Sequence, residues 1–161
     1  MDPKLTEEEI AAFVGKHADY YCTRWTPLIE GQNWTAFNWP AFFLSAFWLP
    51  YRKMYTTTFV FYVCIFLAAM VEEVASKHGA QQSGWHYLRL VAAIIVGANA
   101  NRWYFDHATN VILEHRSKRL PDDVFMDELS KRGGTSIGAA VAFFVTFVAA
   151  LAVVFFLMRA V

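Results

Sequence analysis

The 161-residue chain is far more apolar than an ordinary soluble domain: 57% of its residues are hydrophobic and only 17% are charged, whereas charged residues normally make up about 25%. Its 14 basic and 14 acidic side chains cancel to a formal net charge of zero, so no overall charge attracts nucleic acid. The composition therefore excludes a typical soluble domain and gives no support to a nucleic-acid binder. It predicts an all-α membrane protein.

Residues 1–36 are predicted to form an N-terminal amphipathic helix and a loop on the cytoplasmic side. The start, "MDPKLTEEEIAAF", is acidic and lacks the pattern of a signal peptide. Thr6 and Glu9 have the spacing of a capping box, and apolar residues then follow along one side of a single helix that is expected to end near Pro27. This side can contact the membrane surface, the rest of the chain or a partner. Trp25 near its end favours the membrane interface.

The stretch "NWPAFFLSAFWLPYRKMY" predicts a half-helix over 39–51. The apolar run from Trp39 to Tyr51 rises only about 20 Å as a helix, while a bilayer core is about 30 Å thick. Since basic residues follow at once, we expect a re-entrant or interfacial segment that returns to the cytoplasmic side. Together with Trp25, the expected membrane-interface anchors are Trp39, Trp48, Tyr51, Arg52 and Lys53.

Three transmembrane helices complete the predicted membrane domain, 37–161, with spans at about 54–72, 85–104 and 136–158. Each includes an uncharged apolar stretch of the kind that crosses a bilayer. Basic residues cluster before the first span and between the second and third, while Lys77 alone lies between the first and second. Because short cytoplasmic loops carry the excess of Lys and Arg, the N-terminus is expected in the cytoplasm and the C-terminus outside.

A short cytoplasmic helix is predicted in "HRSKRLPDDVFMDELSKR", after a break at the proline and capped by Asp122 or Asp123. Its cations can attract anionic lipid. The following "GGTS" predicts a hinge and a cap for the last span, with Thr135 or Ser136 as the capping residue. A phosphate-binding loop is the weaker reading of these two glycines.

One face of the second predicted span carries a stripe of small and polar residues, Gly97, Asn101, Tyr104 and His107. In the first reading this is a helix-packing stripe, in which the glycine allows close approach and the polar groups bond across the contact. In the second reading it is a functional site at the cytoplasmic mouth, with His107 titrating near neutral pH beside Arg102 and Asp106. The third span has a comparable stripe of small residues on which a helix is expected to dock.

No catalytic, cofactor-binding or metal-binding residues are predicted. The sequence has no glycine-rich phosphate loop, His-Glu-x-x-His pair or nucleophile elbow. Cys22 and Cys64 are interpreted as packing residues rather than as a metal or redox pair. The chain is therefore not expected to be an enzyme.

Four stretches carry a resemblance to a known family: "FVGKHADYY" (13–21), "FNWPAFFLSAFWLPYRKMY" (37–55), "NRWYFDH" (101–107) and "RGGTS" (132–136). In this order they resemble the small bacterial membrane proteins grouped as domain of unknown function family 2628. The chain departs from the family pattern where His17 replaces an asparagine and Ala100 replaces the glycine before Asn101. The resemblance implies the fold and a location in the bacterial cytoplasmic (inner) membrane, and it brings no activity with it.

The leading functional hypothesis is an accessory, scaffold or assembly subunit of a membrane complex. Its expected partners are the lipid bilayer, other membrane proteins or a second copy of the chain, and anionic lipid. An oligomeric channel or transporter component is the alternative, since pores are also built around half-helices. A lipid-modifying enzyme at the cytoplasmic leaflet is the third hypothesis.

Overall fold

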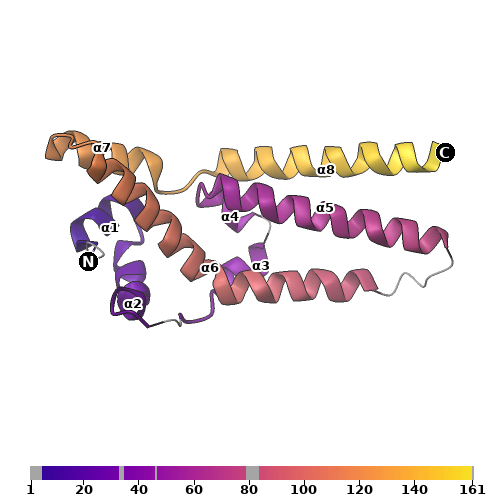
Figure 1. Cartoon of the computed structure of the whole chain (residues 1–161), viewed down its shortest axis with the longest axis horizontal. Coiled ribbons are helices and arrows are strands. Elements are labelled where there is room, and N and C mark those ends of the chain that lie inside the picture. Colours follow the sequence, from indigo (N-terminus) through magenta and orange to yellow (C-terminus); the bar gives the residue numbers. More distant parts are fainter. Residues whose placement is uncertain (1–4, 33–34, 46, 79–83, 161) are drawn as a thin grey trace.

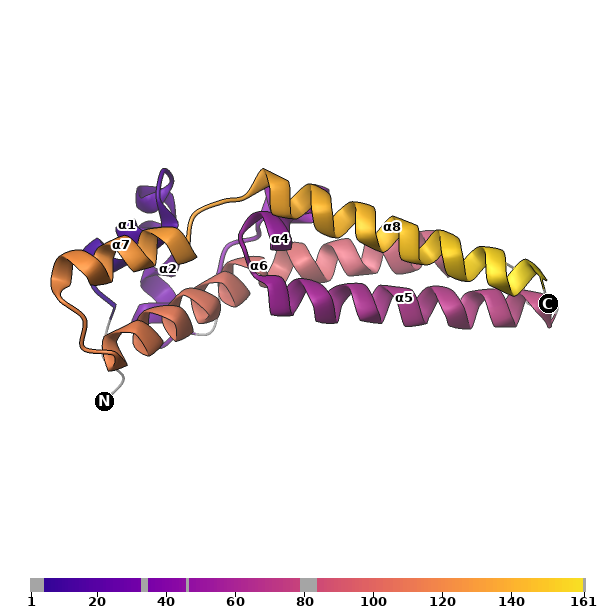
Figure 2. The same ribbon diagram turned by 90° about the horizontal axis from the view of Figure 1, so that it is seen from above.

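The computed structural model of the chain describes residues 5–32, 35–45, 47–78 and 84–160, and every regular element within these ranges is an α-helix. Three long helices run side by side over much of the molecule: α5 (Tyr55–Lys77), α8 (Ile137–Ala160) and the first half of α6 (Gly84–Ser117) (Figures 1 and 2). The predicted all-α architecture is confirmed in the described part of the chain.

The second half of α6 continues beyond the long helices into a lobe. There it packs against α1 (Glu7–Val14), α2 (Ala18–Ile29) and α7 (Asp122–Arg132). Two short helices, α3 (Trp39–Leu44) and α4 (Trp48–Tyr51), lie where the lobe meets the long helices, α3 against α6 and α4 against α8 (Figure 1). We use "the lobe" for α1, α2, α7 and the second half of α6. The helices of the predicted N-terminal unit, 1–36, thus pack against α6 and α7, which come from far along the chain.

The single amphipathic helix expected before Pro27 is in fact two helices. The capping box is confirmed, because the Thr6 N–H donates to Glu9 Oε2 at 2.8 Å and the Glu9 N–H donates to Thr6 Oγ1 at 3.2 Å. The first helix ends at Gly15, whose φ of 73° lies in the left-handed region that favours glycine. The apolar side of α1 and α2 is buried against the chain itself, so the expectation that it covers the membrane surface is wrong.

The expected half-helix over 39–51 is divided as well. Asn38 caps α3 by accepting from the Ala41 N–H at 2.9 Å, and the chain turns at Ser45, where φ is 32°. The segment then continues as α4 and ends at Arg52. Neither piece is long enough to cross a bilayer.

Among the described residues, two segments are long and apolar enough to cross a membrane. One is Tyr55–Lys77, which is α5, and the other is the apolar part of Asp122–Leu157, which lies in α8. The predicted second span, 85–104, does not reach this level, because its part of α6 also carries Arg89, Asn99 and Arg102. The described part of the chain therefore has two candidate membrane-spanning helices.

The predicted break between α7 and α8 is present at residues 133–136. Pro121 occupies the cap position of α7, so Asp122 and Asp123 lie in its first turn rather than at its cap. The Ser136 hydroxyl accepts from the Ala139 N–H at 3.1 Å and so caps the start of α8, as predicted.

The core lies in the lobe and along one face of α6. Five α6 residues, each four positions from the next, are completely buried. They meet apolar residues of α1, α2, α4 and α7 in one cluster. The α6 members are Val96, Ala100, Tyr104, Ala108 and Ile112.

Gly97 allows α3 to approach α6 closely. Its carbonyl accepts from the Asn38 N–H at 2.8 Å. A Cβ at this position would collide with Phe37 Cζ and would lie 2.9 Å from Phe42 Cβ. The ring of Phe37 could turn, but Phe42 Cβ moves only with the backbone of α3. The packing role predicted for Gly97 thus has a concrete basis, although its partner is the short helix α3.

We predict that Gly97→Ala destabilises the protein by about 1–3 kcal/mol, because the added methyl group overpacks the α3 contact. The matched control is Gly138→Ala in α8, where nothing lies within 4 Å of the place that the new methyl group would take. That exchange should be neutral or stabilising, since alanine favours a helix over glycine by about 1 kcal/mol. Thermal unfolding of both variants in detergent measures the difference. Equal effects would contradict the close α3–α6 contact.

Candidate functional site

Arg52 occupies an aromatic cage where the lobe meets the long helices. Its side chain is buried, and the guanidinium carbon lies 4.8 Å from the ring centroid of Tyr21, 5.1 Å from that of Tyr104 and 5.8 Å from that of Tyr51. Its Nη2 also donates to the Tyr21 hydroxyl at 3.0 Å. We call Arg52 and these three tyrosines the Arg52 cage.

The cage joins elements that are distant in sequence. Arg52 directly follows α4, Tyr21 belongs to α2 and Tyr104 belongs to α6. A desolvated cation over an aromatic face stabilises a structure by about 2 kcal/mol. One side chain thus ties the N-terminal helices and α6 to the start of α5.

Further aromatic rings surround Tyr104. The ring centroids of Trp25 and Phe13 lie 5.3 Å and 5.9 Å from that of Tyr104, and Trp48 lies edge-on to it at 5.9 Å. Burial raises the pKa of the Tyr21 hydroxyl, although the charge of Arg52 opposes this. The phenol therefore stays neutral and its oxygen is free to accept from Arg52.

A second polar contact joins α3 to α6. Asn38 Nδ2 donates to Asn101 Oδ1 at 2.8 Å, and Asn101 Nδ2 donates to the Ala36 carbonyl at 2.7 Å. Both asparagines are buried. A buried polar group without its partner costs about 1–3 kcal/mol, so these amides specify where α3 sits on α6.

An ion pair holds α1 to the far part of α6. Arg116 Nε donates to Glu9 Oε1 at 2.7 Å, and Arg116 Nη2 pairs with the other carboxylate oxygen. Burial acts to raise the pKa of Glu9, but the hydrogen bonds from Arg116 and Thr6 outweigh it and the pKa is lowered. Glu9 thus serves both the cap of α1 and the α1–α6 contact.

His107 does not form the predicted group with Arg102 and Asp106. Its half-buried ring lies edge-on to Phe13, with 5.9 Å between ring centroids. Arg102 Nε instead approaches Asp106 Oδ2 at 3.6 Å on the exposed surface. Among the described residues His107 has no hydrogen bond to either, so the structure does not assemble this acid–base set. Burial lowers the pKa of His107.

The predicted stripe on α6 is divided between two neighbours. Gly97 and Asn101 face α3, whereas Tyr104 and His107 face the lobe. Sequence reasoning missed Asn38 as the partner of Asn101. An asparagine just before "WP" is the signature of a helix cap with proline in the first turn, and this signal could have identified it.

The predicted interface anchors need correction. Trp25, Trp48 and Arg52 are buried inside the protein, so they are core residues and do not reach a membrane surface. All three side chains pack against the ring of Tyr104 instead. Trp39 is 60% exposed, and Tyr51 and Lys53 are partly exposed.

Within the part of the chain that the structure describes, no group of His, Cys, Asp or Glu side chains could hold a metal ion. The two cysteines are free thiols, Cys22 in α2 and Cys64 in α5. The site is thus built from aromatic rings, amides and one buried cation.

These features define a helical protein in which two candidate membrane-spanning helices are joined to an aromatic-rich lobe. Residues 7–109 match the model of the family described as "Protein of unknown function (DUF2628)". The chain belongs to this family, as its sequence resemblance indicated. The match covers α1 to α5 and most of α6, including Arg52 and the rings around it. The search of the curated proteins and that of the solved structures gave no significant match.

We predict that acid destabilises the protein through His107. Because burial lowers its pKa in the folded state, the unfolded chain takes up this proton first as pH falls through about 6.5. The free energy of unfolding should therefore fall as pH drops below about 6.5, until the pH lies below the folded-state pKa. Above about 6.5 the ring is neutral in both states and has no such effect.

His107→Gln should remove this loss of stability between about pH 7 and pH 5 while leaving the fold intact. His78→Gln, in an exposed position at the end of α5, is the matched control and should unfold as the wild type does. Unfolding in detergent at a series of pH values is the measurement. An unchanged acid response in His107→Gln would contradict the prediction.

Proposed function

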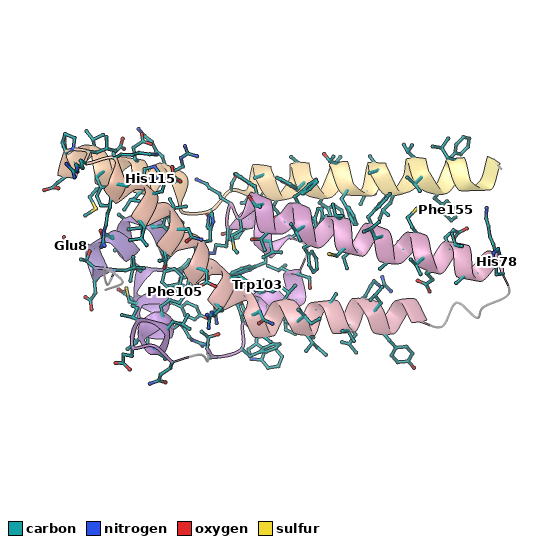
Figure 3. All side chains as sticks on the ribbon, in the orientation of Figure 1. Glu8, His78, Trp103, Phe105, His115 and Phe155 are labelled. Atoms are coloured by element: carbon teal, nitrogen blue, oxygen red, sulfur yellow. The ribbon has the colours of Figure 1, made fainter. Side chains whose placement is uncertain are left out.

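We propose that this chain is a small inner-membrane protein that serves as an accessory or scaffold subunit of a membrane complex. The observation that carries the proposal is the uncovered apolar surface of α5 and α8. Within the chain, only 11% of the most apolar stretch of α5 and 6% of that in the segment containing α8 is buried. Figure 3 shows side chains projecting along both helices, with His78 and Phe155 at the end far from the lobe. Such surfaces are stable only when lipid or another protein covers them.

A groove between α5 and α8 gives this surface a specific shape. It has a volume of about 530 Å³. The helices meet at two ring pairs: Tyr55 stacks on Phe143 with 5.6 Å between centroids, and Tyr62 lies tilted against Phe147 with 4.4 Å between centroids. The Thr146 hydroxyl donates to the Ala142 carbonyl at 2.9 Å, so its proton is already used within α8 and does not require a polar ligand. The lining residues are Phe59, Tyr62, Val63, Phe66, Ala142, Phe143, Thr146, Phe147 and Ala150.

The small residues on the α8 side favour a transmembrane helix of a partner subunit as the occupant. Ala142, Thr146 and Ala150 recur every fourth residue and line this side of the groove with small side chains. Small residues let helix backbones approach closely in a membrane, where packing rather than the hydrophobic effect drives association.

In the proposed topology the lobe lies in the cytoplasm and the first part of α6 supplies a third span. Support comes from the basic residues, which gather in the lobe and at the starts of α5 and α8. The segment over 39–51 then enters from the cytoplasmic side and returns to it, because α3 and α4 lie between the lobe and the long helices. The C-terminus lies outside.

This topology predicts that a single cysteine placed at Ser117 is shielded from an impermeant thiol reagent in intact cells, whereas one at His78 is labelled. Both positions are exposed and lie at opposite ends of the molecule. Cys22 and Cys64 are first replaced by alanine, and labelling after permeabilisation is the control for reactivity. Labelling at both positions in intact cells would reject the three-span arrangement.

For the scaffold role we predict that Thr146→Phe removes the chain from its complex, because the ring fills the α5–α8 groove. Val145→Phe is the matched control, since Val145 is exposed on the neighbouring position of α8 and does not line the groove. Native gel electrophoresis of gently solubilised membranes should show the wild type and Val145→Phe at a size above the single chain, and Thr146→Phe at the size of the single chain.

Thermal unfolding establishes that Thr146→Phe remains folded. The proposal fails if the wild type already migrates as a single chain, or if both variants remain in the larger species.

A further inference from the structure

The Arg52 cage and the adjoining Trp25 contain more buried hydrogen-bond donors than acceptors. Arg52 Nε and Nη1, Trp25 Nε1 and the Tyr104 hydroxyl are all buried and make no hydrogen bond. Trp25 and Arg52 each lie against the ring of Tyr104, with the indole centroid 5.3 Å and the guanidinium carbon 5.1 Å from the Tyr104 ring centroid. The unpartnered groups thus belong to one cluster of side chains, Arg52, Trp25 and Tyr104, built around this ring.

The chemistry of these groups determines what would satisfy them. Guanidinium and indole nitrogens can only donate, while the tyrosine hydroxyl can donate or accept. If the Tyr104 hydroxyl oxygen accepted a hydrogen bond from Arg52, the remaining N–H groups of Arg52 and Trp25 would still outnumber the acceptors. The group that completes the cluster must therefore bring acceptor atoms of its own.

The charge of Arg52 points to an anion rather than to a neutral acceptor. Arg52 is 5% exposed, and the ion pairs of the described residues give it no carboxylate partner. The faces of the three tyrosines and the one hydroxyl contact offset only part of the cost of burying a cation. Buried charges in proteins are normally paired, and arginine is the side chain best suited to phosphate because its fork of N–H groups matches two oxygens.

We propose that the Arg52 cage is a binding site for a phosphate oxyanion, held by Arg52 Nε and Nη1 with the Trp25 and Tyr104 donors beside them. Such a phosphate comes either from solution or from the headgroup of an anionic phospholipid. The second source rests on the proposed membrane function, which would place the junction of lobe and long helices at the headgroup layer. The first source does not depend on it.

Binding to the purified full chain in an uncharged detergent tests the proposal. Two probes are used in parallel: inorganic phosphate, and mixed micelles containing phosphatidylglycerol, with phosphatidylcholine micelles as the reference. Isothermal titration gives the affinity, and the rise in Tm with concentration gives an independent measure, because a ligand that binds only the folded state stabilises it. We expect saturable binding of at least one probe.

Arg52→Met keeps the length of the apolar stem and removes the donors, so it should weaken binding by about tenfold or more. Arg24→Met is the matched control. Arg24 also lies over a tyrosine, 4.8 Å from the ring centroid of Tyr20, but it is partly exposed and outside the cage. This variant should bind as the wild type does.

Two gentler variants keep the test valid if Arg52→Met fails to fold. Tyr104→Phe and Trp25→Phe each remove one donor and keep an aromatic ring, and they should weaken binding by about two- to tenfold. Saturation by inorganic phosphate assigns the site to a free anion, and saturation by phosphatidylglycerol alone assigns it to a lipid headgroup. The proposal is overturned if neither probe binds the wild type, or if Arg52→Met, Tyr104→Phe and Trp25→Phe all bind as tightly as Arg24→Met.

Failure here and failure of the scaffold role are separate results. The titration reports on the isolated chain, whereas the native gel reports on its partners, so each experiment can give a negative answer without the other.

Discussion

The arrangement of this protein depends on the buried face of α6. Its five completely buried residues from Val96 to Ile112 are spaced four apart, and because an α-helix turns 100° per residue, such a row advances by about 40° at each step. Over its length the buried row therefore winds about 160° around the helix. The first part of α6 thus contacts α3 beside the long helices, and its second part, which runs at an angle to the first in Figure 1, contacts α1 and α7 in the lobe.

Tyr104 lies at the midpoint of this row, and it is the centre of a group of aromatic residues from α1, α2 and α4. The rings of Phe13, Tyr21, Trp25 and Trp48 all lie within 6 Å of its own, measured between centroids. Aromatic pairs in such tilted and edge-on geometries add about 0.5–1.5 kcal/mol each beyond the burial of their surface. The junction of lobe and long helices is therefore held by ring packing around one tyrosine and one cation.

The sequence predicted helices well where the signal is local. The capping box at Thr6, the cap at Ser136 and the apolar length of α5 and α8 each depend on residues within one or two turns. Prediction from the sequence failed where the environment of a residue depends on contacts with residues far away in the chain. A tryptophan close to a basic residue in the sequence is typical both of a membrane interface and of a buried aromatic cage. For Trp25, Trp48 and Arg52 the two environments are distinguished only by the contact with Tyr104, which is distant in sequence. The turns at Gly15 and Ser45 were missed for a similar reason, since packing against α6 divides helices that periodicity alone would continue.

The linker between α7 and α8 bears on how the chain is made. A Cβ on Gly133 would collide with the Phe13 carbonyl oxygen, the Gly134 N–H donates to that same oxygen at 2.7 Å, and the Ser136 N–H donates to the Tyr51 carbonyl at 2.8 Å. The predicted hinge is therefore clamped to the end of α1 and to α4. The contacts of α1 are complete only once the segment after α7 has been synthesised, and such long-range closure is slow and leaves apolar surface exposed meanwhile. Completion of the lobe is thus coupled to synthesis of the α7–α8 linker, and a truncation before Gly133 would expose the aromatic core rather than merely remove α8.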